Sequence, residues 1–147
     1  MLKKNSPCQN GPPEGLTITM DKTTLDIPMI CRFLQVDSYW ARGRPEETIK
    51  RSIENSICFG VYLDGRQIGF ARAVTDKAVV FYLADFFILP AYQHSGIGGR
   101  LMDYILACSE LQGLRGILTT QTAHGFYNKF DFRRDNDIVR RRIMVRP

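Results

Sequence analysis

The chain has 147 residues, 44% of them hydrophobic, which is the size and composition of one globular domain with a single core. Its formal net charge is +5, and much of the excess lies in the last fifteen residues, 133–147. These arginines predict a solvated edge strand. Nucleic-acid binding is less favoured, since no aromatic residues lie between them. No apolar stretch reaches the roughly 18 to 20 residues of a membrane-spanning helix, so no membrane partner is expected.

Cysteine usage and the N-terminus indicate a cytoplasmic protein. The four cysteines are scattered singly, without a CxxC pair, and the two histidines lie far apart, which argues against a disulfide framework and against a metal site. They are Cys8, Cys31, Cys58 and Cys108. Residues 1–14 do not resemble a secretion signal and predict a disordered leader, with one domain over residues 15–147.

The first half of the chain predicts a strand, two helices and a hairpin. Residues 16–20 alternate like a strand, and Asp26 and Pro28 mark a helix that begins near residue 25. A second helix is expected after Pro45, with Ile49, Ile53 and Ile57 on its buried face. Residues 57–63 and 67–74 form a hairpin around the dipeptide Asp64-Gly65.

The second half predicts a central strand followed by alternating helices and strands. Residues 79–89 are too continuously apolar for a sheet edge. A helix follows, with Ile97, Leu101, Ile105 and Cys108 on one face, then a buried strand at 115–120, a helix at 123–130 and a last strand at 138–145. The expected fold class is therefore α/β (α+β), a mixed sheet flanked by about four helices on both faces.

The loop "QHSGIGG" before the third helix is the main chemical signal. It fails the dinucleotide pattern GxGxxG, because Leu101 stands at the sixth position, and it fails the Walker pattern, because Arg100 follows Gly99. Glycine amides at the positive end of a helix suit a phosphate or pyrophosphate. Spacing alone leaves open whether these glycines only close a strand-to-helix turn.

Two motifs carry a family resemblance. "QHSGIG", residues 93–98, resembles the Q/RxxGxG/A motif of the GNAT superfamily of N-acetyltransferases, and "FYNKFDF", residues 126–132, resembles its FYxKxGF segment. The order of elements is also similar, so the likeness covers residues 16–147. "SYWARGRP" and "SIENSICFGVY" look like a small bacterial subgroup of that superfamily.

The resemblance implies acetyl-CoA as acetyl donor and no metal. Its pyrophosphate would lie on the amides of residues 93–98, and its pantetheine arm beside the strand that ends at Leu89. Splayed central strands would leave backbone groups of Phe87 and Leu89 free for that arm. The implied cofactor-binding residues are Phe87, Ile88, Leu89, Gln93, His94, Ser95, Gly96, Ile97, Gly98, Gly99 and Arg100.

Three residues are candidates for proton transfer. Tyr127 stands where the resemblance implies a general acid for the departing CoA thiolate; the alternative is a core aromatic beside Phe126. Asp85 is the carboxylate nearest to the cofactor strand and a candidate base, although it could instead cap a bulge or pair with an arginine. His124 and Glu54 are lesser candidates for the base.

Two positions depart from the family pattern. Asp131 replaces a glycine, but aspartate adopts the left-handed conformation more readily than most residues, so the turn is expected to survive. Thr120 stands where many members have an asparagine that contacts the pantetheine arm, which leaves that contact open.

The acceptor side is implied to be the segment "DSYWARGRP". Its candidate substrate-binding residues are Tyr39, Trp40, Arg42 and Arg44. The aromatic residues could stack against an ammonium, whereas the arginines would favour an amine that also carries a carboxylate or phosphate, or an acidic peptide. The alternative is that Trp40 is core and both arginines are solvated.

The sequence thus predicts an N-acetyltransferase that moves the acetyl group of acetyl-CoA to a primary amine of a small molecule or peptide. A non-catalytic acyl-CoA sensor and a nucleic-acid-binding module remain as alternatives. A homodimer built through the C-terminal strand would fit the habit of the family.

Overall fold

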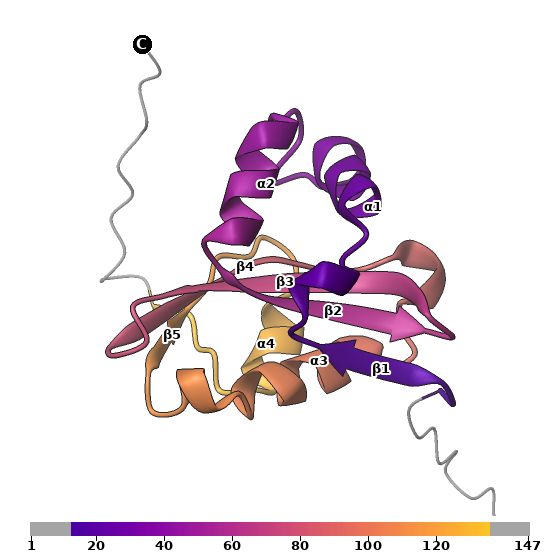
Figure 1. Ribbon diagram of the computed structural model, residues 1–147. Coiled ribbons are helices and arrows are strands. Elements are labelled where there is room, and N and C mark those ends of the chain that lie inside the picture. The colour runs from indigo at the N-terminus through magenta and orange to yellow at the C-terminus, as the bar shows by residue number, and fades with distance from the viewer. Residues whose placement is uncertain (1–12, 136–147) are drawn as a thin grey trace, which may run out of the picture.

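The polypeptide forms a five-stranded mixed sheet with helices on both faces, and the computed structural model describes residues 13–135 (Figure 1). In spatial order the strands are β1 (Leu16–Thr19), β2 (Ile57–Leu63), β3 (Arg66–Thr75), β4 (Val80–Ile88) and β5 (Arg115–Ile117). The helices are α1 (Ile27–Arg32), α2 (Glu46–Glu54), α3 (Ile97–Leu106) and α4 (His124–Asn128). This confirms the predicted fold class.

Two predicted segments lie wholly or mostly outside the residues that the structure describes. The strand expected at 138–145 lies outside the described residues, and so does the leader expected over 1–14, apart from Pro13 and Glu14. Among residues 13–135, no helix is long and apolar enough to cross a membrane.

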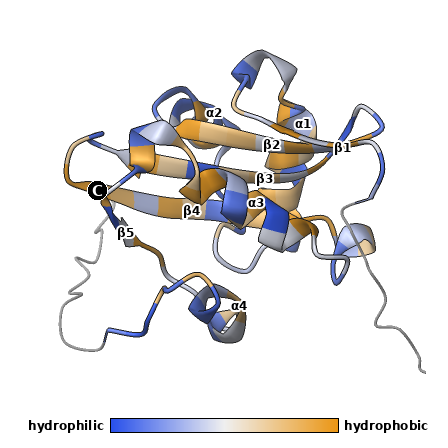
Figure 2. Cartoon of the chain, turned by 90° about the horizontal axis from the view of Figure 1, so that it is seen from below, coloured by the Kyte–Doolittle hydropathy of each residue, from blue (hydrophilic) through white to orange (hydrophobic). Residues whose placement is uncertain are grey.

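Each middle strand contributes to two cores, because alternate residues face opposite sides of the sheet. Phe59 of β2 belongs to the same core cluster as Leu101 of α3, whereas its neighbour Cys58 belongs to the cluster on the other face, with Ile49 of α2. Helices α1 and α2 cover one face, and α3 and α4 lie on the other (Figure 1). Figure 2 shows the middle strands as largely hydrophobic, while α3 mixes hydrophilic and hydrophobic residues. Each large side chain buried this way contributes about 1.5 to 3 kcal/mol.

Helix α1 begins as predicted. The Asp26 side chain caps it by accepting a hydrogen bond from the Met29 amide at 3.0 Å, and Pro28 stands in the first turn, where its missing N–H costs nothing.

Helix α2 also begins as predicted, since Pro45 precedes its first residue and Glu46 and Glu47 lie near its positive end. The expected buried face is partly wrong. Ile49 and Ile53 are buried, but the helix ends at Glu54 and Ile57 opens strand β2. Asn55 and the buried Ser56 turn the chain between them, so the helical spacing of Ile57 is coincidental.

The predicted hairpin joins β2 to β3. Asp64 and Gly65 have φ values of +50° and +80°, the pair of left-handed residues that a tight two-residue turn requires. Residues 57–63 pair with residues 66–73, and β3 also pairs with β4, which lies between β3 and β5 in the interior of the sheet, as its apolar sequence predicts.

Strands β4 and β5 pair only at one end. Their parallel ladder joins residues 80–82 to residues 115–117, and the rest of β4, through Ile88, runs on without β5. The predicted buried strand at 115–120 is therefore shorter than expected, and its Arg115 is exposed. Beyond residue 117 the chain leaves β4 and leads to α4, which opens one edge of β4.

Candidate active site

The open edge of β4 presents different backbone groups from those expected. The Leu89 amide donates to the Ile68 carbonyl oxygen at 2.8 Å, and the Leu89 carbonyl accepts from the Tyr92 amide at 2.9 Å. In an antiparallel ladder, alternate residues point toward the partner strand. Leu89 and Phe87 therefore pair with β3, and the backbone of Ile88 faces the opening. The expectation of free groups on Phe87 and Leu89 is wrong by one residue.

The glycine loop folds back on this edge. The Gln93 side chain donates from Nε2 to the Ile88 carbonyl oxygen at 2.8 Å, and Ser95 Oγ donates to the Tyr92 carbonyl at 2.6 Å. His94 and Gly96 take positive φ values of +62° and +81°. These contacts and angles fix a tight strand-to-helix turn directly beside Ile88.

Helix α3 starts at this loop with open amides. The first helical hydrogen bond runs from the Arg100 amide to the Gly96 carbonyl, so residues 97–99 have no helical acceptor, and no side chain caps them within the described chain. Ile97 is buried and anchors the helix, whereas His94, Ser95, Gly96 and Arg100 are exposed. An accessible helix start with uncapped amides suits an anion.

Tyr127 lies across the opening from β4. Its ring meets those of Phe86 and Phe126 edge-on, with centroids 5.9 and 5.0 Å apart, while Phe126 also lies beside Gly98 of α3. The aromatic cluster thus joins α4 to both β4 and the glycine loop. No partner of the Tyr127 hydroxyl is found among residues 13–135, and no buried polar side-chain atom there lacks one, so the hydroxyl is accessible to solvent where Tyr127 lines two neighbouring hollows.

Burial raises the pKa of Tyr127 to about 12, and Tyr39 adds to that rise. A thiol has a pKa near 8.5, so full proton transfer from this phenol to a thiolate is uphill by about 5 kcal/mol, more than the roughly 2 kcal/mol of an ordinary phenol. Tyr127 therefore stays protonated and acts best as a hydrogen-bond donor to developing negative charge.

Asp85 is the most heavily bonded side chain at the site. Its backbone has φ +51° at a bulge where the β3–β4 register shifts. Its carboxylate accepts from Arg72 Nε at 2.7 Å, from Arg44 Nη1 at 2.9 and 3.1 Å, and from Trp40 Nε1 at 2.9 Å. Burial alone would raise the pKa of Asp85, but the two guanidiniums and these hydrogen bonds outweigh it and lower the pKa. The geometry favours an arginine-paired anchor over a base.

The acceptor segment contributes three of its four predicted residues to the cavity. Tyr39, Trp40 and Arg44 line it, whereas Arg42 is exposed and does not. Trp40 is 40% exposed, so it is not a core residue. The Tyr39 hydroxyl accepts from the Gln121 amide at 3.2 Å and so bridges the acceptor segment to the chain before α4.

Sequence reasoning missed Arg72, which shares Asp85 with Arg44. An arginine within the apolar run of β3 was the available signal, because a charge in a buried strand needs a partner. It also missed the bond between the Tyr82 hydroxyl and Thr119 Oγ1 at 2.8 Å, which ties β4 to the chain after β5.

The two family departures have clear local structures. Asp131 adopts φ +63°, so the expected left-handed turn is present without glycine. The Thr120 hydroxyl accepts from the Ala123 amide at 3.1 Å and shapes the turn before α4.

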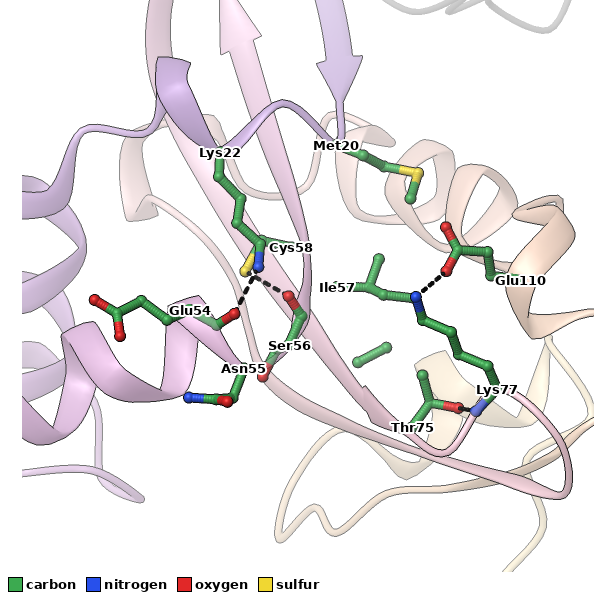
Figure 3. Close-up of a pocket in the computed structure, with 11 residues that line it drawn as sticks. Met20, Lys22, Glu54, Asn55, Ser56, Ile57, Cys58, Thr75, Lys77 and Glu110 are labelled. Atoms are coloured by element: carbon green, nitrogen blue, oxygen red, sulfur yellow. Dashed lines mark hydrogen bonds and ion pairs between the residues drawn. The ribbon is translucent and has the colours of Figure 1, made fainter.

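The remaining predicted residues lie elsewhere. His124 is exposed at the start of α4, and it lines a neighbouring hollow that also contains Tyr127. Glu54 lines a separate cavity at the far end of β2 and β3, where Lys22 Nζ donates to its carbonyl oxygen and Lys77 pairs with Glu110 (Figure 3). Among residues 13–135, no three metal-ligating side chains come together.

The glycine loop, strand β4 and Tyr127 thus lie next to one another in the fold. A family model described as an acetyltransferase (GNAT) domain matches residues 54–134. That match covers more than half of the chain, so this protein belongs to the GNAT family of acetyltransferases.

Two similar proteins agree with this assignment. A Gibberella zeae protein named as an acetyltransferase is 32% identical over 78% of this chain and 81% of its own length. A crystallised protein of Xanthomonas campestris pv. campestris, named as an acetyltransferase of the GNAT family, is 38% identical, with a TM-score of 0.85 over 90% of this chain and 96% of that one.

A more distant structure shares the fold. N-acetylglutamate synthase from Neisseria gonorrhoeae, complexed with coenzyme A and N-acetyl-glutamate, is 20% identical, with a TM-score of 0.64 over 78% of this chain and 27% of that one. The finer resemblance of "SYWARGRP" to a subgroup stays a prediction.

Proposed function

We propose that this protein transfers the acetyl group of acetyl-CoA to a primary amine by direct attack within a ternary complex. One observation carries the proposal: the uncapped start of α3, the outward-facing amide of Ile88 and the ring of Tyr127 are neighbours, because Gly98 of α3 lies beside both Ile88 and Phe126, and Phe126 packs on Tyr127. An anion, an extended amide arm and a leaving thiolate are the groups that these three features would bind in turn.

The loop and strand residues would hold the cofactor in two parts. The pyrophosphate would lie on the amides of residues 94–99, with the exposed Arg100 beside it. The pantetheine arm would pair with the Ile88 amide, while Gln93 keeps the Ile88 carbonyl occupied and fixes the loop. Phe87 and Leu89 would support this edge through their bonds to β3.

The bound acetyl-CoA would supply a thioester, so that the acetyl group passes to the amine nitrogen, the C–S bond breaks, the amine loses one proton and CoA leaves as the thiol. Tyr127 would donate a hydrogen bond to the sulfur as negative charge develops there. The segment with Tyr39 and Trp40 would cover the acceptor side. Cytoplasmic location belongs to the same proposal, since Cys31, Cys58 and Cys108 are buried and unpaired.

Proton removal from the amine would not rely on Asp85. Its pKa is lowered and its oxygens are occupied, so it is a poor base. The adjacent guanidiniums of Arg44 and Arg72 would favour the neutral form of an incoming amine, which at pH 7 is otherwise about one molecule in a few thousand. His124 remains a proposed relay through water.

We therefore expect the pKa of the acceptor amine to set the pH dependence of kcat/KM. Between pH 6 and 10, log kcat/KM should rise with a slope near one and level off at the pKa of the amine used. Two accepted amines whose pKa values differ by about one unit, assayed by CoA release, should give inflections that differ by the same amount. An inflection at one fixed pH for both amines would instead identify a protein base.

Thermal melting with acetyl-CoA tests the proposed function. At about 100 times its dissociation constant the ligand should add about 2.7 kcal/mol of stability, which for a domain of this size is roughly 5 to 10 °C in Tm. No shift would contradict the proposal. A shift without CoA release across a broad amine panel would point to an acyl-CoA sensor instead.

A glycine pair provides the matched control for that experiment. Gly96 and Gly113 both have positive φ, +81° and +74°, with open space where a Cβ would stand. Alanine at either should cost about 1 to 2 kcal/mol of folding stability. Only Gly96→Ala should also weaken acetyl-CoA binding, by about tenfold, because only Gly96 precedes the α3 amides. Equal affinities in the two variants would remove the loop from the cofactor site.

A further inference from the structure

The acceptor cavity carries one uncompensated positive charge. Charged side chains among its lining residues are Arg44, Arg72 and Asp85, two cations against one anion. From this charge balance we propose that the acceptor amine also bears a carboxylate, and that Arg44 binds it. This inference rests on the proposed N-acetyltransferase function and names the substrate class of the same site.

In the cluster of Asp85, Arg44 and Arg72, the carboxylate is buried, whereas both guanidinium side chains are partly exposed. The Asp85 side chain is 2% exposed, and both of its oxygens are already occupied by Arg44, Arg72 and Trp40. The Arg44 and Arg72 side chains are 23% and 14% exposed. A ligand in the cavity therefore meets guanidinium rather than carboxylate, and a bare polyamine would be repelled.

Arg44 has the nitrogens to spare. It reaches Asp85 through Nη1 alone, whereas Arg72 uses Nε for Asp85 and Nη1 for Ser56 Oγ at 3.2 Å. No acceptor among residues 13–135 is found for Nε or Nη2 of Arg44, and no buried polar side-chain atom in that range is left unpaired. Those two nitrogens therefore reach solvent and form the fork that matches a carboxylate.

The cluster also holds this fork in position. Arg44 is fixed from one side by Asp85, while its carbonyl oxygen accepts from Gln35 Nε2 at 2.9 Å. Trp40 donates from Nε1 to the same carboxylate, and this bond fixes the Trp40 side chain, which lines the cavity. Preorganisation lowers the ordering cost of binding a charged ligand. A single residual charge matches a monoanionic group such as a carboxylate.

Matched amine pairs test the inference. Purified full-length protein with acetyl-CoA would be assayed for CoA release with glycine, β-alanine, aspartate, glutamate and short peptides, each beside its carboxamide, and with putrescine and spermidine. A carboxamide lowers the pKa of a nearby amine, so kcat/KM is compared per unprotonated amine. On that basis we expect kcat/KM to be about 10- to 100-fold higher for the acids than for their amides, the range of a charge-assisted paired contact. The diamines should be the poorest acceptors.

Variants assign the preference to one residue. Arg44→Met should reduce the acid-to-amide ratio to near one, whereas Arg42→Met should keep it, because Arg42 lies outside the cavity. Melting of Arg44→Met with acetyl-CoA checks that the variant is folded and still binds the donor. If Arg44→Met does not fold, two other measurements decide whether Arg44 binds the carboxylate. They are the acid-to-amide ratio of the wild type and the same ratio in Arg44→Lys, which keeps the charge but loses the two-nitrogen fork.

The outcomes separate the two proposals. Absence of acetyl-CoA stabilisation overturns the acetyltransferase function itself. Three results would overturn only the proposal that Arg44 binds a carboxylate, provided that acetyl-CoA still stabilises the protein. They are equal use of acids and amides, a preference for diamines, and an unchanged acid-to-amide ratio in Arg44→Met. If acetyl-CoA binds and no carboxylate-bearing amine in the panel is acetylated, the substrate class is also wrong.

Discussion

Replacing Tyr127 by phenylalanine is expected to lower kcat by at least about 100-fold and to leave acetyl-CoA binding unchanged. General-acid and hydrogen-bond stabilisation of a leaving group typically contributes 10²- to 10⁴-fold. The ring of Tyr127 packs among Phe86, Phe126 and Phe132. Its hydroxyl is therefore the only group of this side chain that can donate a hydrogen bond to the leaving thiolate. Phenylalanine keeps that packing, so the fold should survive.

The measurement is steady-state CoA release beside an acetyl-CoA binding isotherm for each protein. Tyr104→Phe is the matched control, because Tyr104 is a partly exposed tyrosine on α3 that meets Phe59 edge-on and lies away from the cavity. It should retain wild-type kcat. Normal turnover in Tyr127→Phe would show that the thiolate leaves without this hydroxyl, and a parallel loss of binding would show that Tyr127 only shapes the cofactor site.

The pH dependence separates a donor from a titrating acid. Because burial raises the pKa of Tyr127 to about 12, its hydroxyl remains protonated throughout the range in which an acetyltransferase is assayed. The wild-type kcat should therefore show no alkaline fall below about pH 10 from this group. A descending limb near pH 9 that is absent in Tyr127→Phe would contradict the raised pKa.

Local signals in the sequence were sufficient for most of the fold. Asp26, Pro45 and the Asp64-Gly65 dipeptide act within a few residues of themselves, through caps and turns, so the elements they begin or join were predicted correctly. Ile57 was misassigned because helical spacing continued across a turn. Periodicity does not reveal where a helix stops when no glycine or proline follows.

The site depends on register, which sequence does not reveal. Whether Leu89 or Ile88 faces the opening is a matter of one residue along β4, and the bulge at Asp85 sets that register. A buried aspartate predicts a partner, but Arg44 and Arg72 lie 41 and 13 residues from Asp85 in sequence. Only the folded sheet brings all three together and determines which charges remain exposed.

Asp85→Asn should produce the largest loss of stability of any single change at the site. Asparagine tolerates the positive φ of this position, so the substitution removes charge without adding backbone strain. Arg44 and Arg72 are then left facing a neutral amide, and breaking a buried ion pair costs about 3 to 5 kcal/mol. For a domain of this size the Tm should fall by roughly 6 to 20 °C.

The pH dependence of stability should change in the same variant. The pKa of Asp85 is lowered in the folded state, so its contribution is fully present above the unfolded aspartate pKa near 3.9 and is lost as pH falls through the lower folded value. The stability difference between wild type and Asp85→Asn should therefore be constant above about pH 4 to 5 and shrink as the pH falls below that range. A constant gap at all pH values would contradict an ionised Asp85.

A double variant distinguishes the anchor from a base. Arg72→Met removes one of the two cations that Asp85 neutralises, so in the Asp85→Asn background it should restore part of the lost Tm, as expected for coupled charges in contact. An anchor role predicts that catalytic activity returns with stability, because the Arg44 and Trp40 positions recover together. If Asp85 were the base, the double variant would fold but stay inactive. The single variant Asp85→Asn would then lose activity without a fall in Tm.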